Sequence, residues 1–275
     1  MQTERLTNSN FDKMIIESID EVMGFDKETG DLLFWFDQIK SGELTSENET
    51  VYAEGRQGVQ LAAFDRNKTA GFSCENGYVV ASALASQLGS EVVVASASKK
   101  LTIQVMDKFT VDKDGAVTRI DPTPASGEET YLSADPKDLT KVKGFVIGSD
   151  NTKIATYDLA VSGQSGKYVF SDTEYDDGGE GHTLLVVYDT EVTTGKQIIN
   201  SGDKFNSNVK LVINFVAQEP CGGKKYLMQC IMPNAKASAT FNLSAGDDPA
   251  VHNFEATALL DICSVNKELF TITMA

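Results

Sequence analysis

The chain has 275 residues, of which 41% are hydrophobic and 23% charged; this composition excludes a disordered protein and predicts a folded core. Its 40 acidic and 24 basic residues give a formal net charge of −16, which repels nucleic-acid phosphates and argues against a DNA-binding or RNA-binding function. No segment approaches the ~18 apolar residues of a membrane span, and the first twenty residues lack a leader pattern. We therefore expect a protein that stays in the cytosol or leaves by another route.

The N-terminal region predicts two segments. In residues 11–23 apolar side chains recur at near-helical spacing up to Gly24, which predicts a short amphipathic segment. This segment is either a helix that packs on the core or an arm that reaches a neighbouring subunit. The apolar run at 31–36 predicts a strand that is buried, lies at an interface, or both.

The next region predicts a β-meander followed by a helix. Strands are expected at 49–54 and 58–65, and a further strand at 69–74 is expected to form a hairpin with the second of these through residues 65–68. After residue 76 the spacing of the apolar residues changes from that of a strand to that of a helix. Asn76 is a candidate cap for a helix at 77–88 that Gly89 ends.

Strands dominate the rest of the chain. Alternation of apolar and polar residues, as at Val209, Leu211, Ile213 and Phe215, is typical of a half-buried antiparallel strand. Further strands are expected at 92–95, 100–111, 144–148, 153–161, 167–170, 183–192, 208–219, 225–234, 236–244, 253–263 and 269–274.

These elements predict a mainly β fold, an antiparallel β-sandwich or barrel with one flanking α-helix at about residues 77–88 and an extended or helical N-terminal arm. We expect a single domain over residues 1–275. Within it, residues 1–30 are a candidate inter-subunit arm and residues 112–180 a candidate surface insertion.

Motifs that would indicate catalysis are missing from the sequence. The two histidines, His182 and His252, have no nucleophile signature beside them, and neither a zinc motif nor a phosphate-binding loop occurs. The four cysteines are scattered, which predicts free thiols. We therefore expect no enzyme activity, no catalytic residue and no cofactor.

An acidic run near residue 175 is the remaining candidate for a metal site. Calcium binds through several oxygen ligands, but the run lacks the order of an EF-hand loop. We therefore interpret it as a solvated surface loop or a lumen loop and expect no metal. Its acidic residues are Asp172, Glu174, Asp176, Asp177 and Glu180.

The order of several segments along the chain, and the pattern of residues within them, resemble those of a known family. The stretches are FWFDQIKSGELT, then YAEGRQGVQLAAFDRNKTAGFSC, then ENGYVVASALASQLGSE, and finally MPNAKASATFNLS, HNFEATALLDI and ELFTITM. Together they cover about half of the chain. In this order they resemble the major tail tube proteins of bacteriophages that infect Gram-positive hosts.

This resemblance implies a structural virion protein located in the tail and assembled in the host cytoplasm. Its copies would form stacked, hexameric rings around an acidic lumen through which DNA is ejected without sequence-specific binding. Its partners would be further copies of the chain and other tail proteins, namely the tape measure, the baseplate or tip, and the terminator; no membrane is involved. An acidic lumen suits this role because retained phosphate contacts would slow the passage of DNA.

Under this hypothesis the N-terminal arm and the aromatic run contact adjacent subunits, although the aromatic run could equally fill the core of its own subunit. Rival interpretations are a head decoration or capsid protein and a β-sandwich module that binds carbohydrate or cell surfaces. The predicted contact residues are Phe11, Ile15, Ile19, Leu32, Phe34, Trp35 and Phe36.

Overall fold

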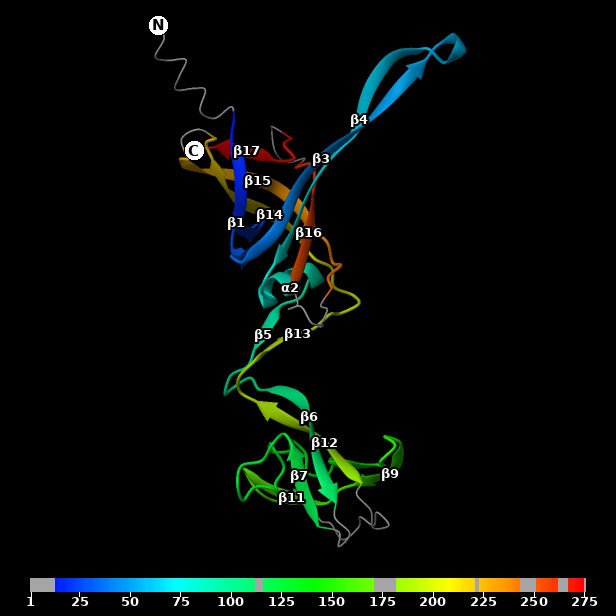
Figure 1. The fold of residues 1–275 in the computed structure, drawn as a ribbon, viewed down its shortest axis with the longest axis vertical. Helices are drawn as coiled ribbons and strands as arrows, with labels where there is room; N and C mark the ends of the chain where they lie inside the picture. Colours follow the sequence, from blue (N-terminus) through cyan, green and yellow to red (C-terminus); the bar gives the residue numbers. More distant parts are fainter. Residues whose placement is uncertain are drawn as a thin grey trace. The chain divides into compact units, whose positions relative to one another are not determined.

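The computed structural model describes residues 13–111, 116–170, 182–220, 223–242, 251–261 and 267–274 (Figure 1). Strands account for 59% of the described residues and helices for 5%, and the sheets are antiparallel, so the predicted mainly β class with one helix is confirmed.

Contacts between residues divide the chain into two compact units. Unit 1 comprises Met1–Val92 and Ile198–Ala275, and unit 2 comprises Val93–Gln197. The predicted insertion at 112–180 falls inside unit 2, while a single domain over the whole chain stays a prediction.

Unit 1 is built on one large antiparallel sheet with the strand order β2-β1-β14-β15-β16-β4-β3, in which β17 also pairs with β15. Its elements are β1 (Ile15–Asp26), β2 (Leu32–Phe36), β3 (Ile39–Glu54), the 3₁₀ turn η1 (Arg56–Gly58), β4 (Gln60–Asn76), α2 (Ala81–Leu88), β14 (Asn208–Gln218), β15 (Lys225–Ala237), β16 (His252–Ala258) and β17 (Thr271–Met274).

The core of unit 1 lies on the inner face of this sheet. Phe34 and Phe36 of β2 lie against Phe254 of β16, with ring centroids 5.2 and 5.5 Å from that of Phe254. The alternation predicted along β14 is confirmed, because Val209, Leu211, Ile213 and Phe215 are all buried. The strands β1 and β3 also approach each other, so the sheet is curled around its core.

The N-terminal segment is a strand from Ile15 to Asp26, and the helical alternative for it is wrong. Its register against β14 shifts between Ile16 and Ser18 and again between Ile19 and Glu21. Each shift disturbs the two-residue alternation of a strand. These irregularities explain why the apolar residues of β1 follow a near-helical spacing in the sequence.

Residues 39–76 form a single long hairpin, β3–β4, whose turn lies at residues 55–58. The predicted hairpin turn at 65–68 is wrong, because residues 65–68 lie inside β4. A register shift between Glu47 and Glu49 on β3 faces Asn67, which has a positive φ of 49°. The local turn signal in the sequence therefore marks a bulge in a continuous strand.

The single α-helix of the described residues, α2, begins later than predicted. Asn76 belongs to β4 rather than capping the helix; its Oδ1 accepts a hydrogen bond from the Gln38 backbone at 3.1 Å. Gly89 ends the helix as predicted, with φ of 66°. A side chain at Gly89 would collide with the Phe205 carbonyl, which lies 2.3 Å from the position that a Cβ would take.

Unit 2 contains a five-stranded antiparallel sheet with the order β7-β6-β12-β8-β9 and a separate β10-β11 hairpin. Two further strands at the unit boundaries, β5 (Val92–Val94) and β13 (Lys196–Ile198), pair with each other. The remaining elements are β6 (Leu101–Val111), β7 (Val117–Asp121), β8 (Lys143–Ile147), β9 (Lys153–Asp158), β10 (Val161–Gln164), β11 (Lys167–Phe170) and β12 (Thr183–Val192).

A buried carboxylate, that of Asp107, organises one side of unit 2. Its Oδ2 accepts hydrogen bonds from the Tyr188 hydroxyl at 2.9 Å and from the Ser133 backbone at 2.8 Å, and its Oδ1 accepts one from the Ser133 hydroxyl. The Tyr188 hydroxyl in turn accepts from the backbone of Ala134 at 3.0 Å. A buried polar group is tolerated where it is hydrogen-bonded, as here.

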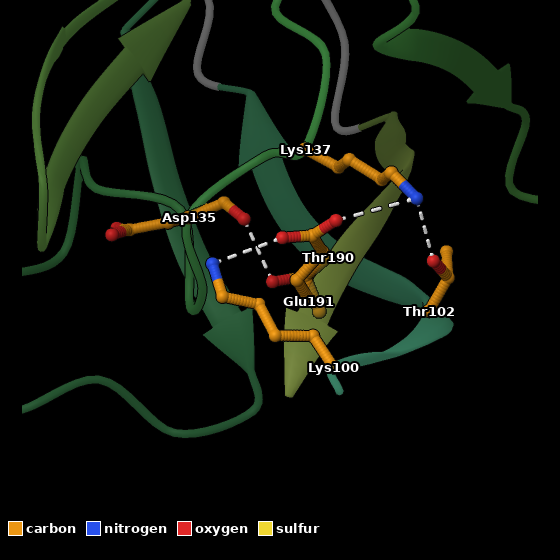
Figure 2. A network of polar contacts seen from close by, with 6 residues as sticks. All are labelled: Lys100, Thr102, Asp135, Lys137, Thr190 and Glu191. Carbon is orange, nitrogen blue, oxygen red and sulfur yellow. Dashed lines mark hydrogen bonds and ion pairs between the residues drawn. The ribbon is translucent and has the colours of Figure 1, made fainter. Parts of the chain in front are cut away.

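The segment that follows Ala134 is held on the sheet by a surface network (Figure 2). Glu191 forms ion pairs with Lys100 at 3.0 Å and with Lys137 at 3.4 Å, and Lys137 also donates to Thr102 at 2.8 Å. Thr190 donates to the Asp135 carbonyl at 2.7 Å. The contacts attach the loop to β6 and β12, so we assign the network a structural role.

Candidate subunit-contact surfaces

The outer part of the β3–β4 hairpin, residues 47–68, extends away from the rest of unit 1 (Figure 1) and is here called the distal ribbon. Two hydrogen bonds fasten its base, from Asn67 Nδ2 to Glu49 Oε2 at 2.6 Å and from Thr50 Oγ1 to Asp65 Oδ1 at 2.8 Å. Among the described residues, β3 and β4 pair only with each other over this part of the hairpin.

Both faces of the distal ribbon carry exposed apolar side chains. The pairing places Val51 opposite Phe64, and Tyr52 opposite Ala63 on the other face. Leu61 is 71% exposed and Phe64 is 55% exposed. A two-stranded ribbon is marginally stable alone in water, so packing of this surface against another element would stabilise it.

A second apolar surface lies beside β1 and β3 and is here called the β1–β3 groove, with a volume of about 640 Å³. Buried Phe215 and Met228 contribute to its floor, while exposed Ile16, Ile272 and Met274 contribute to its rim. The groove is lined by Ile16, Glu17, Ser18, Ile19, Ile39, Lys40, Ser41, Gly42, Glu43, Leu44, Phe215, Met228, Ile272 and Met274.

Unpaired strand edges border the groove. The strand β2 pairs with β1 only from Val22 to Phe25, and β3 pairs only with β4 among the described strands. Among the described strands, the first residues of β1 and the proximal part of β3 therefore each have one edge without a partner strand. Such edges can bind another strand through backbone hydrogen bonds.

The predicted contact residues fall into three environments, and their role in contacts stays a prediction. Phe34 and Phe36 are buried in the core of unit 1, and Ile19 lines the groove. The exposed members are Ile15, Leu32 and Trp35. Phe11 and the acidic residues Asp172, Glu174, Asp176, Asp177 and Glu180 lie outside the described residues.

The distal ribbon was not singled out by the sequence analysis, although the sequence carries a signal for it. In VQLAAF, residues 59–64, apolar side chains occupy both alternating sets of positions. That pattern indicates a strand covered on both faces, and the sequence alone does not identify what covers it. Since the strand is exposed in the isolated chain, the same pattern indicates an interface.

Three of the described side chains that could perform chemistry, His252, Cys74 and Cys230, are buried in unit 1. His252 is buried: its Nδ1 accepts from the Val80 backbone at 3.3 Å and its Nε2 lies 2.9 Å from Gln87 Oε1, which ties α2 to β16. Burial raises the pKa of the Cys74 thiol to about 12 and that of Cys230 to about 11. Both thiols are free, and within the described ranges no cluster of three metal-binding side chains occurs.

None of the helices in the part of the chain that the structure describes is long and apolar enough to span a membrane. The sequence model of the YomU/Tube protein family matches residues 14–272. The matched range includes all the described strands except the last two residues of β17. A comparison with curated proteins finds none that matches the chain.

Proposed function

The chain belongs to the YomU/Tube protein family, a match that fits a phage tail tube protein, and from this premise we propose that it is the repeating subunit of a tail tube built from stacked rings. A tube family is structural rather than catalytic, and its members are components of the virion tail. In this proposal copies of the chain assemble in the host cytoplasm into hexameric rings around a lumen, and the protein has no enzyme activity.

The observation that carries this proposal is the distal ribbon, which exposes Leu61 and Phe64 on opposite faces. A surface of this kind is unfavourable in water and marks a protein-interaction site. Burying one such side chain contributes roughly 1.5–3 kcal/mol. In an assembly of identical subunits, a neighbouring copy can bury these side chains, since every copy presents the same ribbon to its neighbours.

The free strand edges support closure into a ring. The strands β2 and β3 stand at the two ends of the sheet order in unit 1. Contacts between two different patches on identical subunits produce a closed ring when the rotation closes, and closure removes exposed strand edges. The number six follows from the resemblance to tail tube proteins.

The net charge of −16 supports a lumen that conducts DNA. An acidic wall repels phosphates, so it offers a passing duplex little to bind. We propose that DNA is ejected through the rings without sequence-specific contacts. The tape measure, the baseplate or tip and the terminator would be the partners at the core and the ends of the tube.

The test is the concentration at which purified protein begins to assemble, measured by light scattering and sedimentation velocity. The ribbon variant Leu61→Ser/Phe64→Ser is expected to raise this concentration at least tenfold, since about 1.4 kcal/mol of lost contact energy per subunit suffices for that change. The control Ile154→Ser removes an equally exposed apolar side chain from β9, 55% against 55% for Phe64. Equal assembly by the ribbon variant and the control would contradict the proposal.

A further inference from the structure

We propose that the β1–β3 groove of one copy receives the distal ribbon of a second copy, an inference that rests on the proposed function and names the contact that joins two subunits. The two surfaces are chemically alike. Leu61 and Phe64 expose apolar side chains without cover from the described residues, and the groove exposes Ile16, Ile272 and Met274 around a buried apolar floor. Joining them removes both surfaces from water.

Backbone geometry supports the same pairing. The groove is bordered by free edges of β1 and β3, and the outer edges of the distal ribbon are also unpaired among the described strands. An incoming strand can therefore extend the sheet by antiparallel or parallel hydrogen bonds while its side chains fill the groove. This mode of binding requires an extended segment, and the ribbon is already extended before it binds.

The charges at the two surfaces permit this contact, although two copies of a chain with a net negative charge repel each other. The chain carries −16, yet the acidic and basic residues of the distal ribbon nearly balance, and Glu17 beside the groove is paired with Lys225 at 2.7 Å. Repulsion between copies is therefore small at this contact. The charged residues of the ribbon are Glu47, Glu49, Glu54, Arg56, Asp65, Arg66 and Lys68.

The bulge at the base of the ribbon fits a segment that must reach another molecule. At Asn67 the ladder between β3 and β4 is interrupted, and bulges bend a strand and increase its twist. The groove residues belong to β1, β3, β14, β15 and β17 rather than to the ribbon. The contact is thus heterologous, with a donor surface and a different acceptor surface on every copy, and it propagates from one copy to the next.

A complementation experiment with two full-length variants tests this pairing. A second ribbon variant, Leu61→Asp/Phe64→Asp, keeps an intact groove. The groove variant Ile16→Asp/Ile272→Asp keeps an intact ribbon. All four positions are exposed, so both variants are expected to fold, which circular dichroism and thermal melting verify. Each variant alone should remain monomeric at concentrations at which the wild-type protein assembles.

The 1:1 mixture of the two variants should form a dimer and nothing larger, because one intact ribbon and one intact groove remain for a single contact. Mass photometry and sedimentation velocity measure this species. The control Ile154→Asp changes an equally exposed apolar residue on β9, with 55% against 56% exposure for Ile16, and Ile154 does not line the groove. This control should assemble like the wild-type protein.

Two results would overturn the inference. Assembly of the groove variant at the wild-type concentration would show that ribbons pack against some other surface, and a mixture that stays monomeric would assign the groove to a different occupant. Neither result touches the proposed function as long as the wild-type protein assembles. Failure of the wild-type protein itself to assemble would instead contradict the proposed function.

Discussion

The Ile19 side chain fills the space beside Gly42: its Cδ1 lies 2.3 Å from the position that a Cβ on residue 42 would take. Ile19 belongs to β1 and Gly42 to β3, so this contact is where the two strands approach each other. A methyl group on residue 42 would overlap the isoleucine, so the Ile19 side chain would have to move, and the Ser73 carbonyl oxygen lies only 3.1 Å from the same position. The curvature of the unit 1 sheet, and with it the shape of the groove, depends on this pair.

Gly42→Ala should destabilise unit 1 by about 1–3 kcal/mol, since overpacking displaces Ile19. Thermal or denaturant unfolding measures the change. Gly202→Ala is the control, because no atom lies within 4 Å of its Cβ position, and its effect should be within about 0.5 kcal/mol. Adding Ile19→Ala to Gly42→Ala should recover part of the loss; no recovery would contradict the assigned contact.

His252 should make stability fall in mild acid. Burial lowers its pKa below the ordinary value of 6.5, and its Nδ1 can accept from Val80 only while unprotonated. The unfolded chain therefore binds more protons below about pH 6.5, and stability drops as the pH falls from there toward the folded-state pKa. Denaturant unfolding at several pH values measures the slope.

The variant His252→Asn lacks the titrating group, so the difference in unfolding free energy between it and the wild-type protein should shrink between pH 7.5 and pH 5. A difference that stays constant over this range would show that His252 does not titrate as described.

Tyr188→Phe should destabilise unit 2 by about 1–3 kcal/mol, because it removes one donor to the buried Asp107 carboxylate and leaves the Ala134 backbone donor without its acceptor. Burial raises the pKa of Tyr188 to about 12, so in the folded protein its phenol stays neutral well above pH 10. Unfolding of the variant measures the loss. The control is Tyr78→Phe at an exposed position, which should cost little; equal losses would contradict the assigned network.

Cys74 and Cys230 should resist alkylation in the folded protein. Both thiols are buried, and their raised pKa values leave almost no reactive thiolate at pH 8. Iodoacetamide treatment followed by mass spectrometry should show both cysteines unmodified under native conditions and fully modified in denaturant. Rapid native labelling of either one would contradict its burial.

The sequence predicted the fold class because strands such as β14 alternate apolar and polar residues with few interruptions. It failed at β1 and at residues 65–68 for one shared reason: a β-bulge shifts the alternation or imitates a turn, and no local rule separates these cases. The role of the VQLAAF segment could not be read from its pattern alone. Burial by the same chain and burial by a neighbouring copy require the same residues.

The contact residues show a similar limit. Phe34, Trp35 and Phe36 form one aromatic run in the sequence, yet alternation along β2 buries the two phenylalanines and exposes the tryptophan. A continuous apolar run does not reveal which face meets the core. The pairing of β2 with β1 decides it.

Electron microscopy of the purified wild-type protein over a concentration series tests whether the chain is a tail tube subunit. We expect hollow tubes or stacked rings of uniform diameter above a threshold concentration, with sixfold symmetry in end-on views. A protein that remains monomeric up to about millimolar concentration, or that forms closed shells instead of tubes, would contradict this function.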